Sequence, residues 1–522
     1  MTMSRREVLF FFLAFAAILV LGFALRGFFI DDAFIGFRYI DNALHGHGFV
    51  FNPPDRIEGV TNIGWLLVLL PFAWIVPVTL AAKILSLILV LAALWILIRF
   101  VSRALPTDRV IVLLLPLLIA ANLDFTYFSL SGMETPLAGF GLILMLVLTE
   151  QRPSFPALAL IGAFLFLARP ECILLFPLFL LFHNGKSGAS WKRSAWSILV
   201  FAGLIIFMTL ARKSYFGLVL PNTFFAKSTS WGVIAENVLR FIKGTNPNIP
   251  FPFLGWLALP IWANGLSLSL KKDRKTGSFL TAALATGLFF ALYAKPDWTG
   301  MGRYFAPYVP LAMFIFLTGF ADLLRTTLVF LTKSGRVVPV AVGLVGAAFI
   351  VYGCVGTILF LQPDRLEDYP GYVLTSESLI EPSLWMGDHL PDRAVIASGR
   401  IGAVAYYSKK RIFDYKFGLT EPAVAGLRRT AREPFEDPRD PALSKSWTEA
   451  DPGYFLEDLR RIRTIFRLGS EKIEALTIHG RDYRPLKAFP IGLDAVWLLC
   501  ERIDLTPGAA PEKPLDHSAK KR

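Results

Sequence analysis

Phe28-Phe29-Ile30-Asp31-Asp32-Ala33-Phe34-Ile35 joins the end of a long apolar segment directly to two acidic residues. The segment before the pair, residues 8–30, is long enough to cross a bilayer. Its one charged residue is Arg26, whose long side chain can reach the interface. Adjacent carboxylates at a membrane interface repel each other and are poorly solvated, which favours a functional site. The alternative is that Asp31 and Asp32 end the first span and cap the next helix.

The composition of the whole chain indicates a polytopic helical membrane protein. Its 522 residues are 54% hydrophobic with a mean hydropathy of +0.54, and apolar runs of span length recur. The net charge of +13 comes from short basic clusters without interleaved aromatic residues, so it does not indicate nucleic-acid binding. Arg5 and Arg6 precede an apolar run that is too long for a signal peptide, so we expect a retained span. Cys172, Cys354 and Cys500 lie too far apart to predict a metal site or a disulfide framework.

Basic clusters between the apolar runs predict the topology, because positively charged loops stay on the cytoplasmic side. The clusters lie at 5–6, 99–109, 186–193, 271–275 and 325–336. Typical span lengths then predict an all-α transmembrane domain of about eleven helices with a cytoplasmic N-terminus. The spans are expected near 8–30, 79–101, 110–128, 133–150, 155–169, 170–183, 194–212, 252–270, 278–295, 304–325 and 338–361. Residues 63–77 are interrupted by Pro71 and Pro77 and form either a full span or a re-entrant helix, which the charge rule favours.

The chain changes character after the transmembrane domain, residues 1–361. It becomes richer in charge and proline, and an odd number of spans places it outside the cytoplasm. Short alternating segments predict a small extracytoplasmic α/β domain over 365–505, and a tail over 506–522 is expected to be disordered. The expected elements are strands at 394–397, 411–415 and 495–500 and helices at 402–408 and 454–467.

Unusual polar residues gather in the predicted first outer loop, 31–62. The loop begins with an amphipathic helix that we expect to lie on the membrane, and it carries a further carboxylate at Glu58. His45 and His47 are flanked by glycines, which is more typical of surface histidines than of metal ligands.

Further charged residues stand at other span ends. Ser131 and Glu134 have capping-box spacing, so Glu134 can cap a helix, serve a site, or do both. Arg169 and Glu171 interrupt apolar sequence, where charges are costly unless they pair or face a cavity. A structural ion pair is the alternative there.

Two later loops also combine charge with a predicted outer position. The loop with Asn222 and Lys227 is basic, which suits an anionic lipid phosphate, the alternative being ordinary headgroup contact. Asp297 and Arg303 stand between two spans, either as site residues or as a structural pair.

These side chains together suit transfer of a sugar from a lipid phosphate. Such a donor would hold its anomeric carbon at headgroup level, and Asp31 or Asp32 could take the proton from an attacking acceptor hydroxyl. Cations would stabilise the departing phosphate. The candidates for donor or phosphate binding are Lys227, Arg303, Asn222 and Arg169. The candidate supporting carboxylates are Glu58, Glu134, Glu171 and Asp297.

The set of motifs resembles the GT-C-type glycosyltransferases, integral membrane enzymes that use polyprenyl-phosphate sugars. The first loop closely resembles the branch that includes the mycobacterial terminal arabinofuranosyltransferase. Its matching motifs are Asp31-Asp32-Ala33-Phe34-Ile35, Phe37-Arg38-Tyr39, His47-Gly48-Phe49-Val50-Phe51-Asn52-Pro53 and Glu58-Gly59-Val60-Thr61-Asn62. Later matches are Ser131-Gly132-Met133-Glu134-Thr135, Arg169-Pro170-Glu171, Tyr215-Phe216-Gly217, Pro221-Asn222-Thr223-Phe224, Asp297-Trp298, Arg303 and Gly402-Ala403-Val404-Ala405-Tyr406-Tyr407. The resemblance implies a polyprenyl-phospho-sugar donor and a catalytic base within the acidic pair.

The sequence therefore predicts an inverting glycosyltransferase at the outer face of the cytoplasmic membrane. The acceptor would be a cell-envelope glycan, glycolipid or protein, arabinofuranose is one candidate sugar, and the C-terminal domain would help to choose the acceptor. A lipid-linked saccharide transporter or flippase is the alternative, but it should carry charged residues through both halves of the membrane. A non-catalytic scaffold would leave the acidic pair unexplained. No cofactor is assigned, although Asp31, Asp32 and Glu134 could form an oxygen site for a divalent cation.

Overall fold

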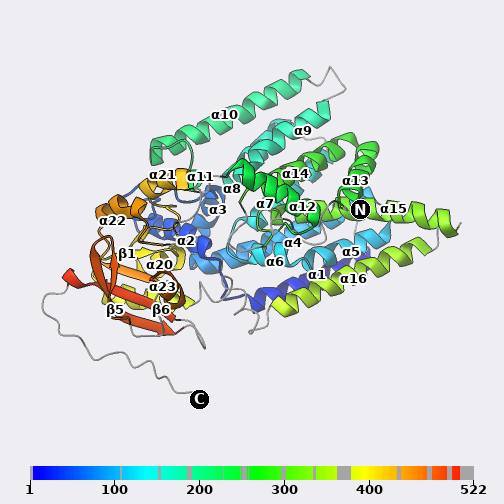
Figure 1. Cartoon of the computed structure of the whole chain (residues 1–522). Coiled ribbons are helices and arrows are strands. Elements are labelled where there is room, and N and C mark those ends of the chain that lie inside the picture. Colours follow the sequence, from blue (N-terminus) through cyan, green and yellow to red (C-terminus); the bar gives the residue numbers. More distant parts are fainter. Residues whose placement is uncertain are drawn as a thin grey trace, which may run out of the picture.

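The computed structural model describes most of the chain as a bundle of apolar helices joined to a smaller α/β domain (Figure 1). It describes residues 4–505 except 106–107, 151–154, 185–190, 227–228, 247–248, 250–255, 257, 296–300, 333–336, 361–377, 432–434, 436, 467–472 and 491–495. The predicted tail over 506–522 lies outside the described residues.

All the regular elements described in the N-terminal part are helices. Its long elements begin with α1 (Arg5–Ala24), which Ser4 and Glu7 start through a capping box. The α-helices that follow are α2 (Asp31–Leu44), α3 (Ile63–Ala73), α4 (Val78–Ala104), α5 (Arg109–Ala120), α6 (Leu123–Leu130), α7 (Thr135–Glu150), α8 (Phe155–Ala168), α9 (Leu175–Asn184), α10 (Trp191–Phe216), α11 (Asn222–Ala226), α12 (Trp231–Lys243), α13 (Ala258–Lys272), α14 (Arg274–Tyr293), α15 (Val309–Thr332) and α16 (Val337–Phe360). Two 3-10 helices, η1 (Pro170–Leu174) and η3 (Ala306–Tyr308), precede α9 and α15.

The predicted count of eleven membrane spans is not confirmed. Among the described residues, six helices are long and apolar enough to cross a bilayer, or seven if the bent pair α5 and α6 is one span. Helices α7 and α8 have 16 and 14 residues, so they rise only about 24 and 21 Å. Helix α3 has 11 residues and is too short to span alone, so its length favours the re-entrant interpretation of 63–77.

The C-terminal domain contains one mixed six-stranded sheet. Its strands are β1 (Val395–Ser398), β2 (Arg411–Asp414), β3 (Tyr454–Asp458), β4 (Leu476–Ile478), β5 (Arg481–Pro490) and β6 (Val496–Arg502), in the order β2-β1-β3-β6-β5-β4. Strand β1 pairs in parallel with both β2 and β3, and the remaining pairs are antiparallel. The helices are α19 (Ile380–His389), α20 (Gly402–Ser408), α21 (Pro422–Ala431), α22 (Ser444–Ala450) and α23 (Leu459–Phe466).

The predicted helix at 454–467 is wrong in its first part. Residues 454–458 form the central strand β3, and only the second part is the helix α23. Tyr454 and Leu456 pack in the apolar cluster toward the helical bundle, whereas Phe455 packs in the cluster on the other face of the sheet. This alternation is the period of a strand, which burial on both faces hid from the sequence pattern. The predicted strands 394–397 and 411–415 are confirmed to within one residue, and the helix 402–408 is confirmed. The predicted strand 495–500 is confirmed from Val496, since residue 495 lies outside the described residues.

Helix α2 lies at the junction of the two parts (Figure 1). The helix itself was predicted, and protein covers most of it; its expected position at the membrane surface stays a prediction. Ten of its 14 residues are buried, and the rings of Phe34 and Phe37 contact Tyr406 of α20. The C-terminal domain is therefore seated directly on the segment that carries the acidic pair.

Candidate active site

Asp31 is the first residue of α2 and is held by the C-terminal domain. Its carboxylate oxygens accept hydrogen bonds from the backbone N–H groups of Gly402, at 3.0 Å, and of Ala403, at 2.9 Å. Ile30 rather than Asp31 is the N-cap residue of α2, so the helix-cap alternative does not describe this side chain. Burial raises the pKa of Asp31 above its ordinary value, although the two N–H groups oppose the shift.

Asp32 forms an ion pair with Arg303, one of the cations that the sequence predicted for the site. Arg303 Nη1 donates to Asp32 Oδ2 at 2.8 Å, and 18% of the Asp32 side chain remains exposed. Arg303 is itself buried at the start of the segment that leads into η3 and α15. The structure thus brings together the acidic pair and Arg303, whereas Asp297, which was considered as the alternative partner of Arg303, lies outside the described residues.

A small pocket of about 80 Å³ opens beside the acidic pair. Helix α2 contributes Asp31, Asp32 and Ile35 to its wall. The C-terminal domain contributes Gly399, Arg400, Ile401, Lys416, Phe417, Leu419, Glu457 and Arg461. The acidic pair therefore faces a cavity that both parts of the chain enclose.

Glu134, Arg169 and Glu171 form a buried cluster close to this junction. Arg169 Nη1 donates to Glu134 Oε1 at 2.9 Å, and Arg169 Nε donates to Glu171 Oε1 at 2.7 Å. Asn62 donates its side-chain amide to the second Glu134 oxygen at 2.9 Å. Because one guanidinium serves two carboxylates, removing it would leave two buried charges without their cation.

The capping-box alternative for Ser131 and Glu134 is not seen. Ser131 Oγ donates to Phe128 O at 2.9 Å, and helix α7 begins only at Thr135. Glu134 instead joins the cluster described above.

Glu58 and Asn222 connect the first loop to α10, α11 and the C-terminal domain. Glu58 Oε2 lies 2.7 Å from Arg212 Nε, and the Asn222 N–H donates to Glu58 O at 2.9 Å. The Asn222 amide donates to Gly418 O and Leu419 O at 2.7 and 3.0 Å. Both amide protons thus hold a loop of the C-terminal domain, and this geometry differs from the predicted phosphate contact. Burial raises the pKa of Glu58 to about 7, and Arg212 opposes that shift.

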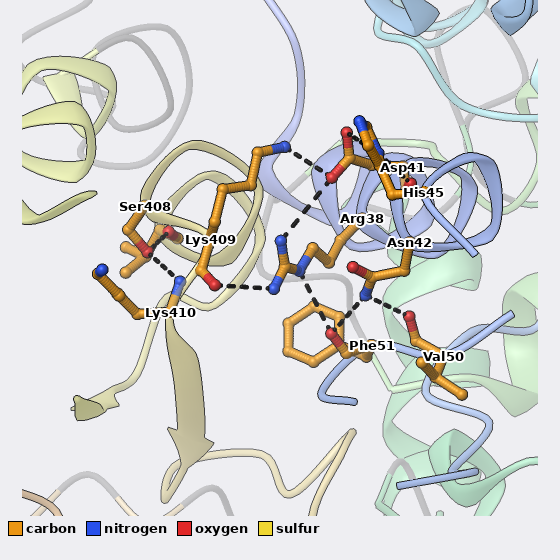
Figure 2. A network of polar contacts seen from close by, with 10 residues as sticks. Arg38, Asp41, Asn42, His45, Val50, Phe51, Ser408, Lys409 and Lys410 are labelled. Atoms are coloured by element: carbon orange, nitrogen blue, oxygen red, sulfur yellow. Dashed lines mark hydrogen bonds and ion pairs between the residues drawn. The ribbon is translucent and has the colours of Figure 1, made fainter. Parts of the chain in front are cut away.

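A second network fastens α2 to α20 farther along the helix (Figure 2). Arg38 donates to Phe51 O at 3.3 Å and to Lys409 O at 3.1 Å. Asn42 donates to Val50 O and Phe51 O, and Lys409 Nζ donates to Asp41 at 2.7 Å. These first-loop residues therefore shape the loop and seat the C-terminal domain.

Asn52 pairs with the backbone of β2 through its side chain. Its side-chain amide donates to Ile412 O at 2.8 Å, and its side-chain oxygen accepts from Ile412 N at 3.1 Å. The side chain thus satisfies the free edge of β2 as a neighbouring strand would.

No group of three or more His, Cys, Asp or Glu side chains within the described part of the chain is arranged to hold a metal ion. Glu134 is held by Arg169 and Asn62, so Asp31, Asp32 and Glu134 do not form the three-carboxylate site considered from the sequence. Lys227 lies outside the described residues.

Several residues at the junction were missed by sequence reasoning. Arg400, Lys416, Glu457 and Arg461 come from a domain where isolated charges normally mark a solvated surface, so no local signal distinguished them. Asp124 was also missed, although a carboxylate within an apolar run is such a signal; it accepts the Gly302 N–H at 2.6 Å, next to Arg303.

Comparisons with known proteins agree with this architecture. Residues 373–504 match the family described as "Domain of unknown function (DUF8728)". The terminal beta-(1->2)-arabinofuranosyltransferase of Mycobacterium tuberculosis is 27% identical over 361 residues, which cover 65% of this chain and 54% of that protein. The chain thus spans about half the length of that relative.

Solved structures share the fold. ArnT from Cupriavidus metallidurans in the apo state has 14% identity and a TM-score of 0.54, and the match covers 94% of this chain and 97% of that chain. The structure of the same protein bound to undecaprenyl phosphate has 13% identity and a TM-score of 0.52, and the match again covers 94% of this chain and 97% of that chain. The Archaeoglobus fulgidus oligosaccharyltransferase, tethered with an acceptor peptide, has 12% identity and a TM-score of 0.51, and the match covers 86% of this chain and 69% of that chain. The chain therefore shares the fold of ArnT and of this oligosaccharyltransferase, and it is similar in sequence to an arabinofuranosyltransferase.

Proposed function

We propose that this chain is an inverting glycosyltransferase that moves a sugar from a polyprenyl-phosphate donor to a cell-envelope acceptor at the outer face of the cytoplasmic membrane. The observation that carries the proposal is the pocket in which the acidic pair lies beside Arg303, at the junction of an apolar bundle and a second domain. A carboxylate and a cation at such a junction are the two groups that this displacement requires.

Asp32 is the proposed catalytic base. It lines the pocket and keeps part of its side chain exposed, whereas both oxygens of Asp31 already accept backbone N–H groups. As the acceptor oxygen bonds to the anomeric carbon, the bond from that carbon to the phosphate oxygen breaks. The acceptor proton passes to Asp32, and the polyprenyl phosphate leaves with the bonding electron pair. A single displacement inverts the anomeric centre.

Arg303 is proposed to bind the phosphate. Its pairing with Asp32 holds it beside the base, and a phosphate oxygen could share the planar guanidinium with the carboxylate. Lys227 remains a candidate for the same role. Arg169 is proposed instead to position the surrounding turns, because it already serves two carboxylates and Tyr304 O.

The proposed sugar and lipid carrier are inferred from the similar proteins. Arabinofuranose is the candidate sugar because the similar Mycobacterium tuberculosis protein is a terminal arabinofuranosyltransferase. A polyprenyl phosphate fits the solved complex of ArnT with undecaprenyl phosphate. Nothing in the comparisons favours the transporter alternative.

The test is transfer by the purified full-length protein from a panel of radiolabelled polyprenyl-phospho-sugars to a membrane extract that contains acceptors. Wild type should use one donor, and Asp32→Asn should lower kcat at least about a thousandfold, because the base is lost while the donor site is kept. Asp31→Asn should chiefly loosen the contact with the C-terminal domain. Loss of kcat in Asp31→Asn with an active Asp32→Asn would reverse the two roles. Absence of transfer from every donor would overturn the proposal.

A further inference from the structure

The pocket beside the acidic pair lies at the carboxyl ends of three parallel strands. Strand β1 ends at Ser398, β2 at Asp414 and β3 at Asp458, and β1 pairs in parallel with the other two. The segments that follow these strands therefore reach the same edge of the sheet. Crevices outside the carboxyl ends of parallel strands are where open α/β sheets bind ligands.

Each of the three segments contributes one cationic side chain to the pocket lining at this edge. Arg400 follows β1, Lys416 follows β2, and Arg461 lies in α23 directly after β3. All three line the same pocket as Asp31 and Asp32, so the edge of the sheet faces the proposed catalytic pair.

The backbone around these cations is held in place. Asp414 accepts the N–H groups of Phe417 and Leu419 at 2.9 and 2.7 Å, which fixes the turn that carries Lys416. Gly399 lies so close to this turn that an added Cβ would come within 3.2 Å of Lys416 Cδ. The three segments thus form a shaped wall at this edge of the pocket.

The charges of the pocket are nearly balanced. Its carboxylates are Asp31, Asp32 and Glu457, and Glu457 is held by Tyr415 Oη at 2.5 Å and lies 3.5 Å from Arg461 Nε. The lining thus holds three carboxylates and three cations, and Arg303 stands beside it, paired with Asp32. Cations of this kind bind a phosphate through charge-assisted hydrogen bonds.

We propose that Arg400 and Lys416 bind the phosphate of the lipid-linked donor, so that the C-terminal domain supplies part of the donor site. This inference rests on the proposed function and names a role for the domain beyond the expected choice of acceptor. Arg303, which pairs with Asp32 beside the pocket, would then contact the phosphate together with the two domain cations that line it.

The test measures binding of undecaprenyl phosphate, separately from turnover, to the full-length protein in lipid nanodiscs. Arg400→Gln and Lys416→Gln are compared with Lys445→Gln, which removes an exposed cation of α22 outside the pocket lining. Each of the first two should weaken binding about tenfold or more, since one charge-assisted contact is lost. Lys445→Gln should change binding less than twofold. Undecaprenol, which lacks the phosphate, should bind wild type and all three variants alike. Inorganic phosphate serves as a second probe and should compete only weakly, because it lacks the lipid.

The outcomes separate this inference from the proposed function. If wild type binds undecaprenyl phosphate and transfers sugar, but both pocket variants bind as tightly as wild type, the inference alone is overturned. An equal loss for undecaprenol would also overturn it, since the effect would not depend on phosphate. If wild type neither binds the lipid phosphate nor transfers sugar, both proposals fail.

Discussion

Gly402→Ala tests whether α20 must touch α2 to complete the site. An added Cβ at this position would lie 1.9 Å from Asp31 O and 2.9 Å from Asp31 Oδ1. Because Cβ contacts below 3.0 Å are essentially never seen, the two helices must separate by more than about 1 Å. The hydrogen bonds from Gly402 and Ala403 to Asp31, now 3.0 and 2.9 Å, would then stretch beyond hydrogen-bonding distance.

The cost can be worked from these contacts. Overpacking costs about 1–3 kcal/mol, and each lost hydrogen bond to a charged group costs about 1.5–3 kcal/mol. Because separation of the helices relieves the overpacking, the two lost hydrogen bonds determine the cost, and we expect the contact between the C-terminal domain and α2 to weaken by about 3 kcal/mol or more. Since 1.4 kcal/mol corresponds to a factor of ten, local opening should become about a hundredfold more frequent.

Hydrogen–deuterium exchange of the protein in nanodiscs measures this opening directly. Exchange over residues 402–408 should rise about a hundredfold in Gly402→Ala, and sugar transfer should fall with it. The matched control is Gly426→Ala in α21, where an added Cβ meets nothing within 4 Å. That variant should match wild type or exchange slightly more slowly, because alanine favours the helix. Exchange in Gly402→Ala within threefold of wild type would refute the reasoning.

Four further predictions follow from the same geometry. Asn222→Ala should speed hydrogen–deuterium exchange in the loop after β2, because the Asn222 amide holds two carbonyl groups of that loop, and the KM for the donor should stay within twofold of wild type. A large rise in KM would instead indicate that Asn222 contacts the donor phosphate. Arg169→Ala should destabilise the protein by about 3–5 kcal/mol in thermal unfolding, since two buried carboxylates lose their cation, and an unchanged melting temperature would contradict the account. Glu58 has a pKa raised from 4.5 to about 7, so its contribution to stability is complete below pH 4.5 and is lost as the pH rises to 7. Stability should fall by up to about 3 kcal/mol over that interval, and an identical pH profile in Glu58→Gln would be inconsistent with this assignment. Transfer should survive excess EDTA, because Glu134 is tied to Arg169 instead of joining the acidic pair; loss of transfer that Mg²⁺ restores would reveal an essential metal.

The apolar pattern predicted the long bundle helices but not which of the other apolar segments are long enough to span. The expected span 79–101 is α4 (Val78–Ala104), and the expected span 338–361 is α16 (Val337–Phe360). The count of eleven is not confirmed, because several of the described apolar helices, such as α3 and α8, are shorter than a span. Tertiary contacts set helix ends, and a window of apolar residues does not contain them.

The acidic pair could be recognised from its unusual place in the sequence, but its partners could not. Asp31 contacts Gly402, which lies 371 residues away, and Asp32 contacts Arg303, which lies 271 residues away. The predicted site residues Glu58 and Asn222 take part in seating the C-terminal domain, a role that only the folded arrangement reveals. Arg400 and Lys416 carry no local signal because surface charges look the same in sequence.

The proposed reaction exchanges a sugar–phosphate bond for a glycosidic bond in one displacement. It is tested most directly by incubating purified protein with a lipid-linked sugar donor and acceptor, then measuring released polyprenyl phosphate and the anomeric configuration of the product. One polyprenyl phosphate should be released per sugar transferred, with the configuration inverted, and Asp32→Asn should give neither product. Retention of configuration, or movement of the intact lipid-linked sugar across the bilayer without bond cleavage, would contradict it.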